Sequence, residues 1–201
     1  MNFLDLKYED NSVDAAYAIE ATCHVAERLK CYSEVFRALK PGCYFAGYEW
    51  VMKEAYKPGD KKHEEIKRGI EIGNALAPLL TGEQVQQTLI SAGFELLDAR
   101  DIGDGHSGHS LSWAHPLKRG DWSLQTFRMS WLGRQMTHNM LKVMEATRLA
   151  PKGTVDVSNV LMLAADCLVD GAKLDIFTPC YFFWARKPTV PRSLTDKTPE
   201  A

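Results

Sequence analysis

Two short apolar segments of this sequence each end in a carboxylate, and an amphipathic segment separates them. The first runs from Val13 to Ile19 and is followed by Glu20, and the second runs from Cys43 to Glu49. Between them, from Glu27 to Leu39, apolar residues recur at helical spacing until a Pro-Gly pair ends the pattern. This order predicts a βαβ unit with parallel strands and a right-handed crossover. Since ligands of α/β proteins bind outside the carboxyl ends of parallel strands, we expect Glu20 and Glu49 to point into one cleft.

The rest of the chain continues the alternation of helices and strands. Ile66 and Ile70 begin one helix, and Thr81 with Gln84 forms a capping box for another that ends at Ala92 and is closed by Gly93. A strand follows that glycine. We therefore expect an α/β fold.

Two further helices and an aromatic strand are predicted toward the C-terminus. The first helix carries an apolar stripe, which we interpret as core packing, a dimer contact or a wall of a ligand tunnel: Phe127, Trp131, Met136, Met140 and Met144. The second helix is expected from Thr154 to Asp170, ended by Gly171. The strand is expected from Leu174 to Arg186, where Pro179 indicates an edge or a bulge.

The composition excludes several classes of protein. With 45% apolar and 25% charged residues among 201, the chain has the make-up of an ordinary globular protein. The formal net charge of -2, without a basic stripe, argues against nucleic acid as a partner. No apolar run reaches the roughly 18 to 20 residues that span a bilayer, so any membrane contact would be peripheral. Five cysteines without a Cys-x-x-Cys pair or a secretory signature indicate reduced thiols in the cytosol.

A glycine- and histidine-rich stretch from Asp101 to Asp121 is longer than ordinary connections, which suggests a lid or an insertion. His106, His109 and His115 lie in it, but their spacing fits no common ligand set. No metal site is predicted.

Several short motifs occur in the order and spacing of one protein family. The run Ile19 to His24 (Ile-Glu-Ala-Thr-Cys-His) and the run Tyr48 to Trp50 (Tyr-Glu-Trp) come first. Gly69 to Gly73, Leu149 to Gly153 and Ala185 to Pro188 follow. Each motif is a weak signal alone, and together they are a strong one. On these residues the chain resembles the sterol 24-C-methyltransferase family.

The resemblance implies a partial class I methyltransferase sheet, which is Rossmann-like, and S-adenosyl-L-methionine as the cofactor. It implies the C-terminal half of the methyltransferase core at 1–100, a sterol methyltransferase C-terminal region at 101–186 and a flexible tail at 187–201. It also implies a sterol substrate, a homo-oligomer in the full-length form, and a location on the cytosolic face of the endoplasmic reticulum membrane.

In the family pattern, the first three strands and the glycine-rich turn that holds the cofactor's methionine end fall before Met1. Phe3 is then the residue that stacks on adenine, and Ile19 and Ala21 border the cofactor. The segment Val13 to Ile19 would be a central strand with one edge left open. We therefore expect this polypeptide alone to fold poorly or to associate, and to be inactive, either as a truncated gene product or as half of a split protein.

The family's reaction creates a carbocation on the sterol side chain. By resemblance, Tyr48 and Trp50 supply aromatic faces that stabilise the cation. A base must take the final proton, and the sequence does not choose among Glu20, His24 and Glu49.

The resemblance also implies that Cys23 and Asn74 contact the sterol. Asn74 replaces a family acid, so its amide can hydrogen-bond a hydroxyl but cannot act as a base. More ordinary interpretations stay open: Cys23 as a small apolar filler, and His24 as a helix-entry residue bonded to backbone.

Two other functions remain as alternatives to the sterol C24 methyltransferase. One is a non-catalytic sterol-binding or regulatory subunit. The other is a related small-molecule methyltransferase with a different isoprenoid or alkaloid acceptor.

Overall fold

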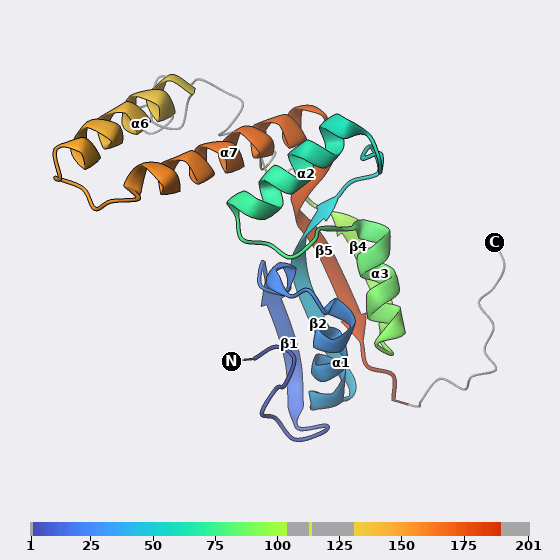
Figure 1. Ribbon diagram of the computed structural model, residues 1–201. Helices are drawn as coiled ribbons and strands as arrows, with labels where there is room; N and C mark the ends of the chain where they lie inside the picture. The colour runs from blue at the N-terminus through green and yellow to red at the C-terminus, as the bar shows by residue number, and fades with distance from the viewer. Residues whose placement is uncertain (1, 104–112, 114–130, 190–201) are drawn as a thin grey trace. The chain divides into compact units, whose positions relative to one another are not determined.

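The computed structural model describes residues 2–103, 113 and 131–189 (Figure 1). In chain order the elements are β1 (Val13–Ile19), the 3-10 turn η1 (Thr22–His24), α1 (Arg28–Ala38), β2 (Leu39–Met52), α2 (Lys61–Gly73), β3 (Leu80–Thr81), α3 (Gly82–Ser91), β4 (Glu95–Asp101), α6 (Trp131–Ala146), α7 (Thr154–Lys173) and β5 (Phe177–Arg186). A first unit of the chain consists of Met1–Val51, Leu80–Ile102 and Pro179–Ala201, and a second consists of Met52–Leu79 and Gly103–Thr178. This differs from the expected division at residue 100, because α2 packs on α7 within the second unit.

The βαβ unit predicted at the start of the chain is confirmed. β1 and β2 pair in parallel, with Val13 opposite Leu39 and Ile19 opposite Tyr48. α1 connects the two strands and turns Cys31, Tyr32 and Ala38 inward.

The sheet has the order β1-β2-β5-β4, with β3 paired to β2. β4 and β5 are antiparallel. Within the described residues β1 ends this order, so one of its edges is open as expected, whereas β5 lies inside the order. Of the two alternatives predicted for Pro179, an edge or a bulge, the edge position is therefore wrong. Pro179 stands near the start of β5, where a missing ladder hydrogen bond costs least.

α1 and α3 cover one face of the sheet (Figure 1). The core between them is aromatic, since the Phe45 and Phe183 rings lie 5.0 Å apart and the Tyr32 ring lies 5.8 Å from Phe45. The capping box of Thr81 and Gln84 begins α3 as predicted.

The opposite face of the sheet carries exposed rings. Tyr17 is 81% exposed and Tyr44 is 42% exposed, while the Tyr44 ring lies 5.4 Å from Trp184 of β5. The first unit therefore has one buried face and one apolar face that the described residues leave uncovered.

The second unit is built from α2, α6 and α7. Gly69 lets α2 approach α7 closely, because an added Cβ there would lie 2.2 Å from the Cys167 sulfur. The predicted end of α7 at Gly171 is wrong. Gly171 stays inside the helix, where a Cβ would lie 3.3 Å from Phe177, so this glycine serves close packing.

The apolar stripe of α6 is exposed in the described part of the chain. Trp131, Met136 and Met140 are 65%, 56% and 54% exposed, so they are not packed into the core of this chain as one interpretation held. Phe127 of the same stripe lies outside the described residues, as do His106, His109 and His115. No helix in the described ranges has both the length and the apolar character to cross a bilayer.

Lys187, which we expected to begin a flexible tail, is buried. Its ammonium group donates to Asn11 Oδ1 at 2.7 Å, Phe36 O at 2.7 Å and Leu39 O at 2.8 Å. It thus binds carbonyls at the C-terminal end of α1, where a cation is favoured by the helix dipole.

Candidate functional site

The candidate site lies at the carboxyl ends of β1 and β2. The ladder between these strands ends where the Glu20 amide donates to Tyr48 O at 3.2 Å. Glu20 then has a φ of 49°, in the left-handed region, which turns the chain out of the sheet and into η1. The Val25 amide closes that turn by donating to Thr22 O at 2.9 Å.

Glu49, at the end of β2, points into the helix-covered core. It is 1% exposed, and its carboxylate accepts hydrogen bonds from the Tyr32 hydroxyl at 2.8 Å and from the Thr22 hydroxyl. Arg28 Nη1 lies 3.8 Å from the second carboxylate oxygen. Burial raises the pKa of Glu49, opposed by Arg28 and the two hydroxyl donors.

Arg28 in turn holds η1. Its guanidinium donates to Thr22 O and, at 3.1 Å, to Cys23 O. Arg28 is 6% exposed, and its Nε is buried without a hydrogen-bond partner in the described structure. Sequence reasoning missed both Arg28 and Tyr32. Their i, i+4 spacing on one face of α1 was the available signal.

The expectation that Glu20 and Glu49 share one cleft is therefore wrong for Glu49. Side chains alternate along β2, so Glu49 shares the core-facing side with Phe45 and Gly47, whereas Tyr48 and Trp50 face the other side. Glu20, freed from the ladder by its left-handed backbone, is exposed. The two acids differ because one lies within the strand pleat and the other lies beyond it.

The remaining predicted residues of the turn divide by exposure. Cys23 is 1% exposed, and burial, followed by the Glu49 charge, raises its pKa to about 12. It is a neutral thiol, as the apolar-filler interpretation holds. His24 is exposed, and Ala21 is half-buried beside it.

Two further predicted residues are exposed, and one of them, Ile19, lies on the uncovered side of the sheet, paired with Tyr48 of β2. Ile19 is 60% exposed and Phe3 is 38% exposed. Burial raises the pKa of Cys180 in β5, and the charges of Asp101 and Glu20 raise it further. The C-terminal ends of β1 and β4 and the start of β5 lie at the same end of the sheet, although β1 and β4 are its two outer strands.

The predicted aromatic residues Tyr48 and Trp50 lie on β2, whereas Asn74 lies at the end of α2. Tyr48 and Trp50 are half-buried, and the Tyr48 ring lies 5.7 Å from Phe182. Asn74, in the second unit, caps α2, and its amide nitrogen donates to Ile70 O at 2.8 Å. One of its two polar ends is therefore used within the helix end.

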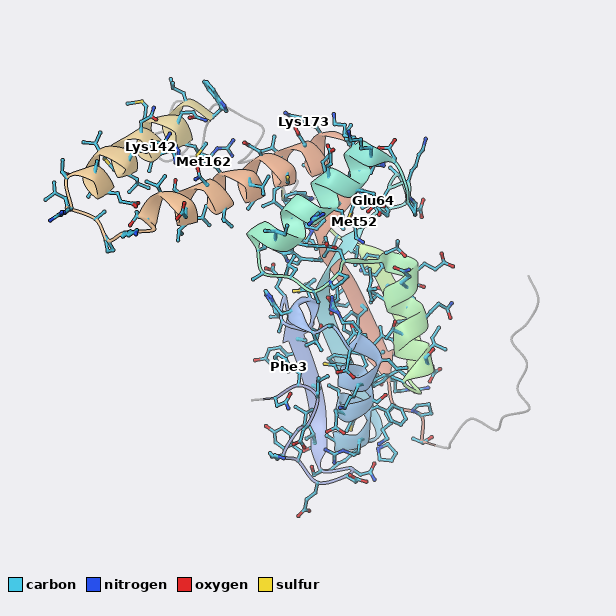
Figure 2. All side chains as sticks on the ribbon, viewed as in Figure 1. Phe3, Met52, Glu64, Lys142, Met162 and Lys173 are labelled. Atoms are coloured by element: carbon cyan, nitrogen blue, oxygen red, sulfur yellow. The ribbon has the colours of Figure 1, made fainter. Side chains whose placement is uncertain are left out.

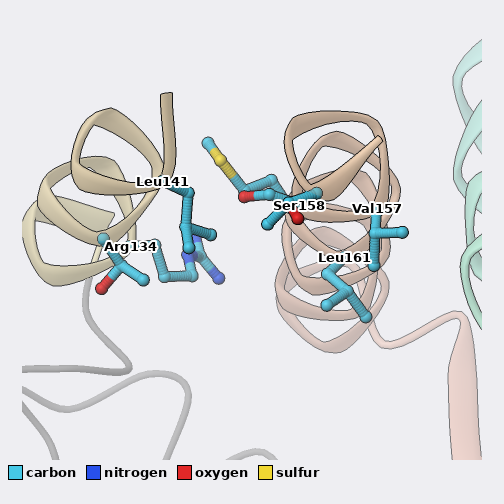
Figure 3. Close-up of a pocket in the computed structure, with 8 residues that line it drawn as sticks. Arg134, Leu141, Val157, Ser158 and Leu161 are labelled. Carbon is cyan, nitrogen blue, oxygen red and sulfur yellow. The ribbon is translucent and has the colours of Figure 1, made fainter. Parts of the chain in front are cut away.

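A groove of about 450 Å³ lies between α6 and α7 (Figure 3). Apolar walls come mainly from Leu141, Val157 and Leu161, and Figure 2 places Met162 between the two helices. Ser158 adds a hydroxyl that is 2.9 Å from His138 Nδ1, and both side chains are buried. A wall of a ligand tunnel is one interpretation of the apolar stripe of α6, but α6 lines this groove with Arg134, Thr137 and Leu141, which are not stripe residues.

Residues that could bind a metal ion do not gather in groups of three or more within the described ranges. The arrangement at the strand ends is an exposed carboxylate and imidazole on a turn held from beneath by a buried polar cluster.

Comparisons with known proteins agree with this architecture. Residues 124–189 match the model of the sterol methyltransferase C-terminal region, and residues 1–47 match that of a methyltransferase domain. The geranyl diphosphate C-methyltransferase from Streptomyces coelicolor A3(2), solved with S-adenosyl-L-homocysteine, aligns with a TM-score of 0.57 at 13% identity, over 93% of this chain and 50% of that chain. The fold is that of a class I methyltransferase domain, present in part.

Sequence comparison indicates a narrower class of protein than comparison of folds does. The cycloartenol-C-24-methyltransferase of Arabidopsis thaliana is 44% identical over 187 residues, which cover 93% of this chain and 55% of that protein. The sterol 24-C-methyltransferase of Saccharomyces cerevisiae is 38% identical over 208 residues, covering 100% of this chain and 54% of that protein. The chain is thus similar along nearly its whole length to sterol 24-C-methyltransferases, and it spans about half the length of these curated relatives.

Proposed function

We propose that this chain is part of a sterol 24-C-methyltransferase, which moves a methyl group from S-adenosyl-L-methionine to C24 of a sterol side chain. The observation that carries the proposal is the 44% identity to the plant cycloartenol-C-24-methyltransferase across 93% of the chain. The activity, the cofactor and the sterol are assigned to the whole protein, of which this chain matches about half.

S-adenosyl-L-methionine supplies the activated methyl group. The exposed Phe3 ring and the exposed Ile19 side chain suit the apolar faces of its purine, and Ala21 follows at the strand end. Neither parallel strand is followed by glycine, since Glu20 comes after β1 and Lys53 after β2. These residues therefore fit one side of the cofactor and leave its methionine end to other parts of the protein.

Glu20 and His24 are our candidates for the base that takes the final proton. A general base must reach the proton it removes, and these are the two exposed titratable groups of the turn. Glu49 is excluded from this role because it is 1% exposed and accepts two hydroxyl hydrogen bonds.

Tyr48 and Trp50 remain our candidates for stabilising the carbocation. Each aromatic face contributes about 0.5 to 2 kcal/mol to a nearby cation. They follow the uncovered side of β2, the side that also carries the exposed Ile19.

The groove between α6 and α7 is our candidate for holding the apolar body of the sterol. It lies within residues 124–189, which match the sterol methyltransferase C-terminal model. Its walls combine aliphatic side chains with the Ser158 hydroxyl, a combination that suits a lipid with few polar groups. Asn74 stays a predicted sterol contact, with its amide nitrogen already bonded to its helix, whereas the 1% exposure of Cys23 favours the apolar-filler interpretation over a sterol contact.

The test is transfer of label from methyl-labelled S-adenosyl-L-methionine to cycloartenol or another sterol with a C24 double bond, in detergent micelles. The full product of the gene should form a C24-methylated sterol. Glu20→Gln should lower kcat by about 10² to 10⁴-fold if Glu20 is the base. Glu27→Gln is the matched control, because Glu27 is exposed just before α1 and makes no side-chain cap.

Two outcomes would replace the proposed function, and a third would change the proposed site. Sterol binding without transfer would indicate a non-catalytic sterol-binding subunit. Transfer to another isoprenoid or to an alkaloid would indicate a different acceptor. Transfer at the wild-type rate in both Glu20→Gln and His24→Asn would remove the turn from the mechanism.

A further inference from the structure

Four buried polar side chains meet beneath the Glu20–His24 turn. Thr22, Arg28, Tyr32 and Glu49 are 3%, 6%, 0% and 1% exposed, and all belong to the first unit. Buried polar groups cost free energy unless they are paired, so such a cluster in an aromatic core requires a reason.

The contacts of the cluster converge on the turn. The Thr22 hydroxyl donates downward to Glu49, and Arg28 donates to the carbonyls of Thr22 and Cys23. Glu49 is itself fixed by the Tyr32 hydroxyl at 2.8 Å. The turn is thus held through one side chain and two consecutive backbone carbonyls.

The turn also needs such support. Glu20 has a φ of 49°, a left-handed conformation that is unfavourable for a residue other than glycine and persists only where its surroundings fix it. η1 has no side-chain cap of its own at Ala21. The hydrogen bonds of Arg28 and Thr22 therefore hold the turn in place of a side-chain cap.

The geometry of Arg28 fits holding the turn better than neutralising Glu49. Its Nη1 is 3.8 Å from the Glu49 carboxylate, beyond hydrogen-bond distance, while both of its terminal nitrogens donate to turn carbonyls. Its Nε is left unbonded in the described structure. Arg28 therefore bonds two carbonyls of the turn while its own Nε keeps no hydrogen-bond partner.

We propose that Arg28 and Glu49 are positioning residues, which set the conformation of the turn that presents Glu20 and His24. Both are buried beneath the turn, whereas the groups that they position are exposed. The role of the presented groups in proton transfer rests on the proposed function, whereas the positioning itself does not.

Amide hydrogen exchange in the full gene product tests the positioning without methyl transfer. The reporter is the Val25 amide, which closes η1, measured against core amides of β2 such as Phe45. In Arg28→Met we expect the Val25 amide to exchange about 10-fold faster or more relative to the β2 amides, because two hydrogen bonds from a charged donor are lost. The control is Lys187→Met, which removes a buried, bonded cation at the opposite end of β2, and should change both reporters by the same factor.

A double variant separates positioning from charge balance. Arg28→Met with Glu49→Gln removes both charges, and replacing a buried pair often restores global stability. We expect the β2 amides to recover and the Val25 amide to stay fast, since the bonds from Arg28 to the turn are still missing.

Recovery of the Val25 amide in the double variant would overturn the proposal, because the pair would then only balance charge. Equal acceleration of both reporters in Arg28→Met would overturn it as well, since the effect would be global. Neither result depends on whether the protein methylates sterols.

Discussion

The Tyr32 hydroxyl offers the smallest change that tests the buried cluster. Tyr32→Phe removes one oxygen atom and keeps the ring, which contacts Phe45 and Phe183 at centroid distances of 5.8 Å and 6.1 Å. The lost hydrogen bond, 2.8 Å long, goes to a carboxylate that is 1% exposed. A hydrogen bond to a charged group contributes about 1.5 to 3 kcal/mol, so we expect the free energy of unfolding to fall by about 2 kcal/mol.

The measurement is urea unfolding together with a thermal scan. For a chain of this size about 2 kcal/mol corresponds to a Tm lowered by roughly 4 to 8 °C, with an unchanged denaturant slope. The hydroxyl donor favours the ionised form of Glu49, so its removal should raise the pKa of Glu49 further and cost more stability at pH 8 than at pH 4.

Tyr17→Phe is the matched control, because Tyr17 is 81% exposed on the same sheet and the same oxygen atom is removed. It should leave the Tm within the error of the scan. A Tyr32→Phe variant as stable as the control, or more stable, would refute the reasoning that the Tyr32–Glu49 hydrogen bond stabilises the core.

Three further expectations follow from the same structure. Burial holds the pKa of Glu49 above its ordinary value of 4.5, so the stabilisation by the protonated carboxyl is fully present below that value and is lost as pH rises through the raised pKa. The stability difference between wild type and Glu49→Gln should therefore change across that pH window at up to about 1.4 kcal/mol per pH unit. A difference that stays constant in urea titrations at several pH values would contradict this expectation. Gly69→Ala should lower the free energy of unfolding by about 1 to 3 kcal/mol, because the added Cβ would lie 2.2 Å from the Cys167 sulfur. The control Glu65→Ala, at an exposed position of the same helix, should change stability little. Equal effects of the two variants in thermal scans would contradict the close packing of α2 on α7. This chain made alone should associate through the open edge of β1. Tyr17→Lys, at an 81% exposed position of that strand, should reduce the association seen in concentration-dependent light scattering. A monomer that melts cooperatively and binds S-adenosyl-L-methionine would contradict this expectation.

The local elements were predictable because their signals lie within a few residues of each other. The parallel pair of β1 and β2 follows from a strand, a helix and a strand in sequence, and it is confirmed. The capping box of Thr81 and Gln84 needs only two side chains three residues apart. The motifs of the family are likewise read along the chain.

Burial of a polar side chain could not be predicted in the same way. The sequence places Glu49 at the end of a strand, but only the sheet decides which face it takes, and the partners Thr22 and Tyr32 approach from other elements. The same limit applies to Gly171. Its sequence position is typical of a helix end, and only the tertiary structure shows that it packs closely against Phe177.

The sequence by itself determined the βαβ order, the family resemblance and the residues of the Glu20–His24 turn, because each depends on short spacings along the chain. The tertiary structure alone decided that Glu49 lies under the turn and Glu20 on it. The physical reason is the pleat of β2, which turns Glu49 toward α1, and the left-handed backbone at Glu20, which releases that residue from the sheet.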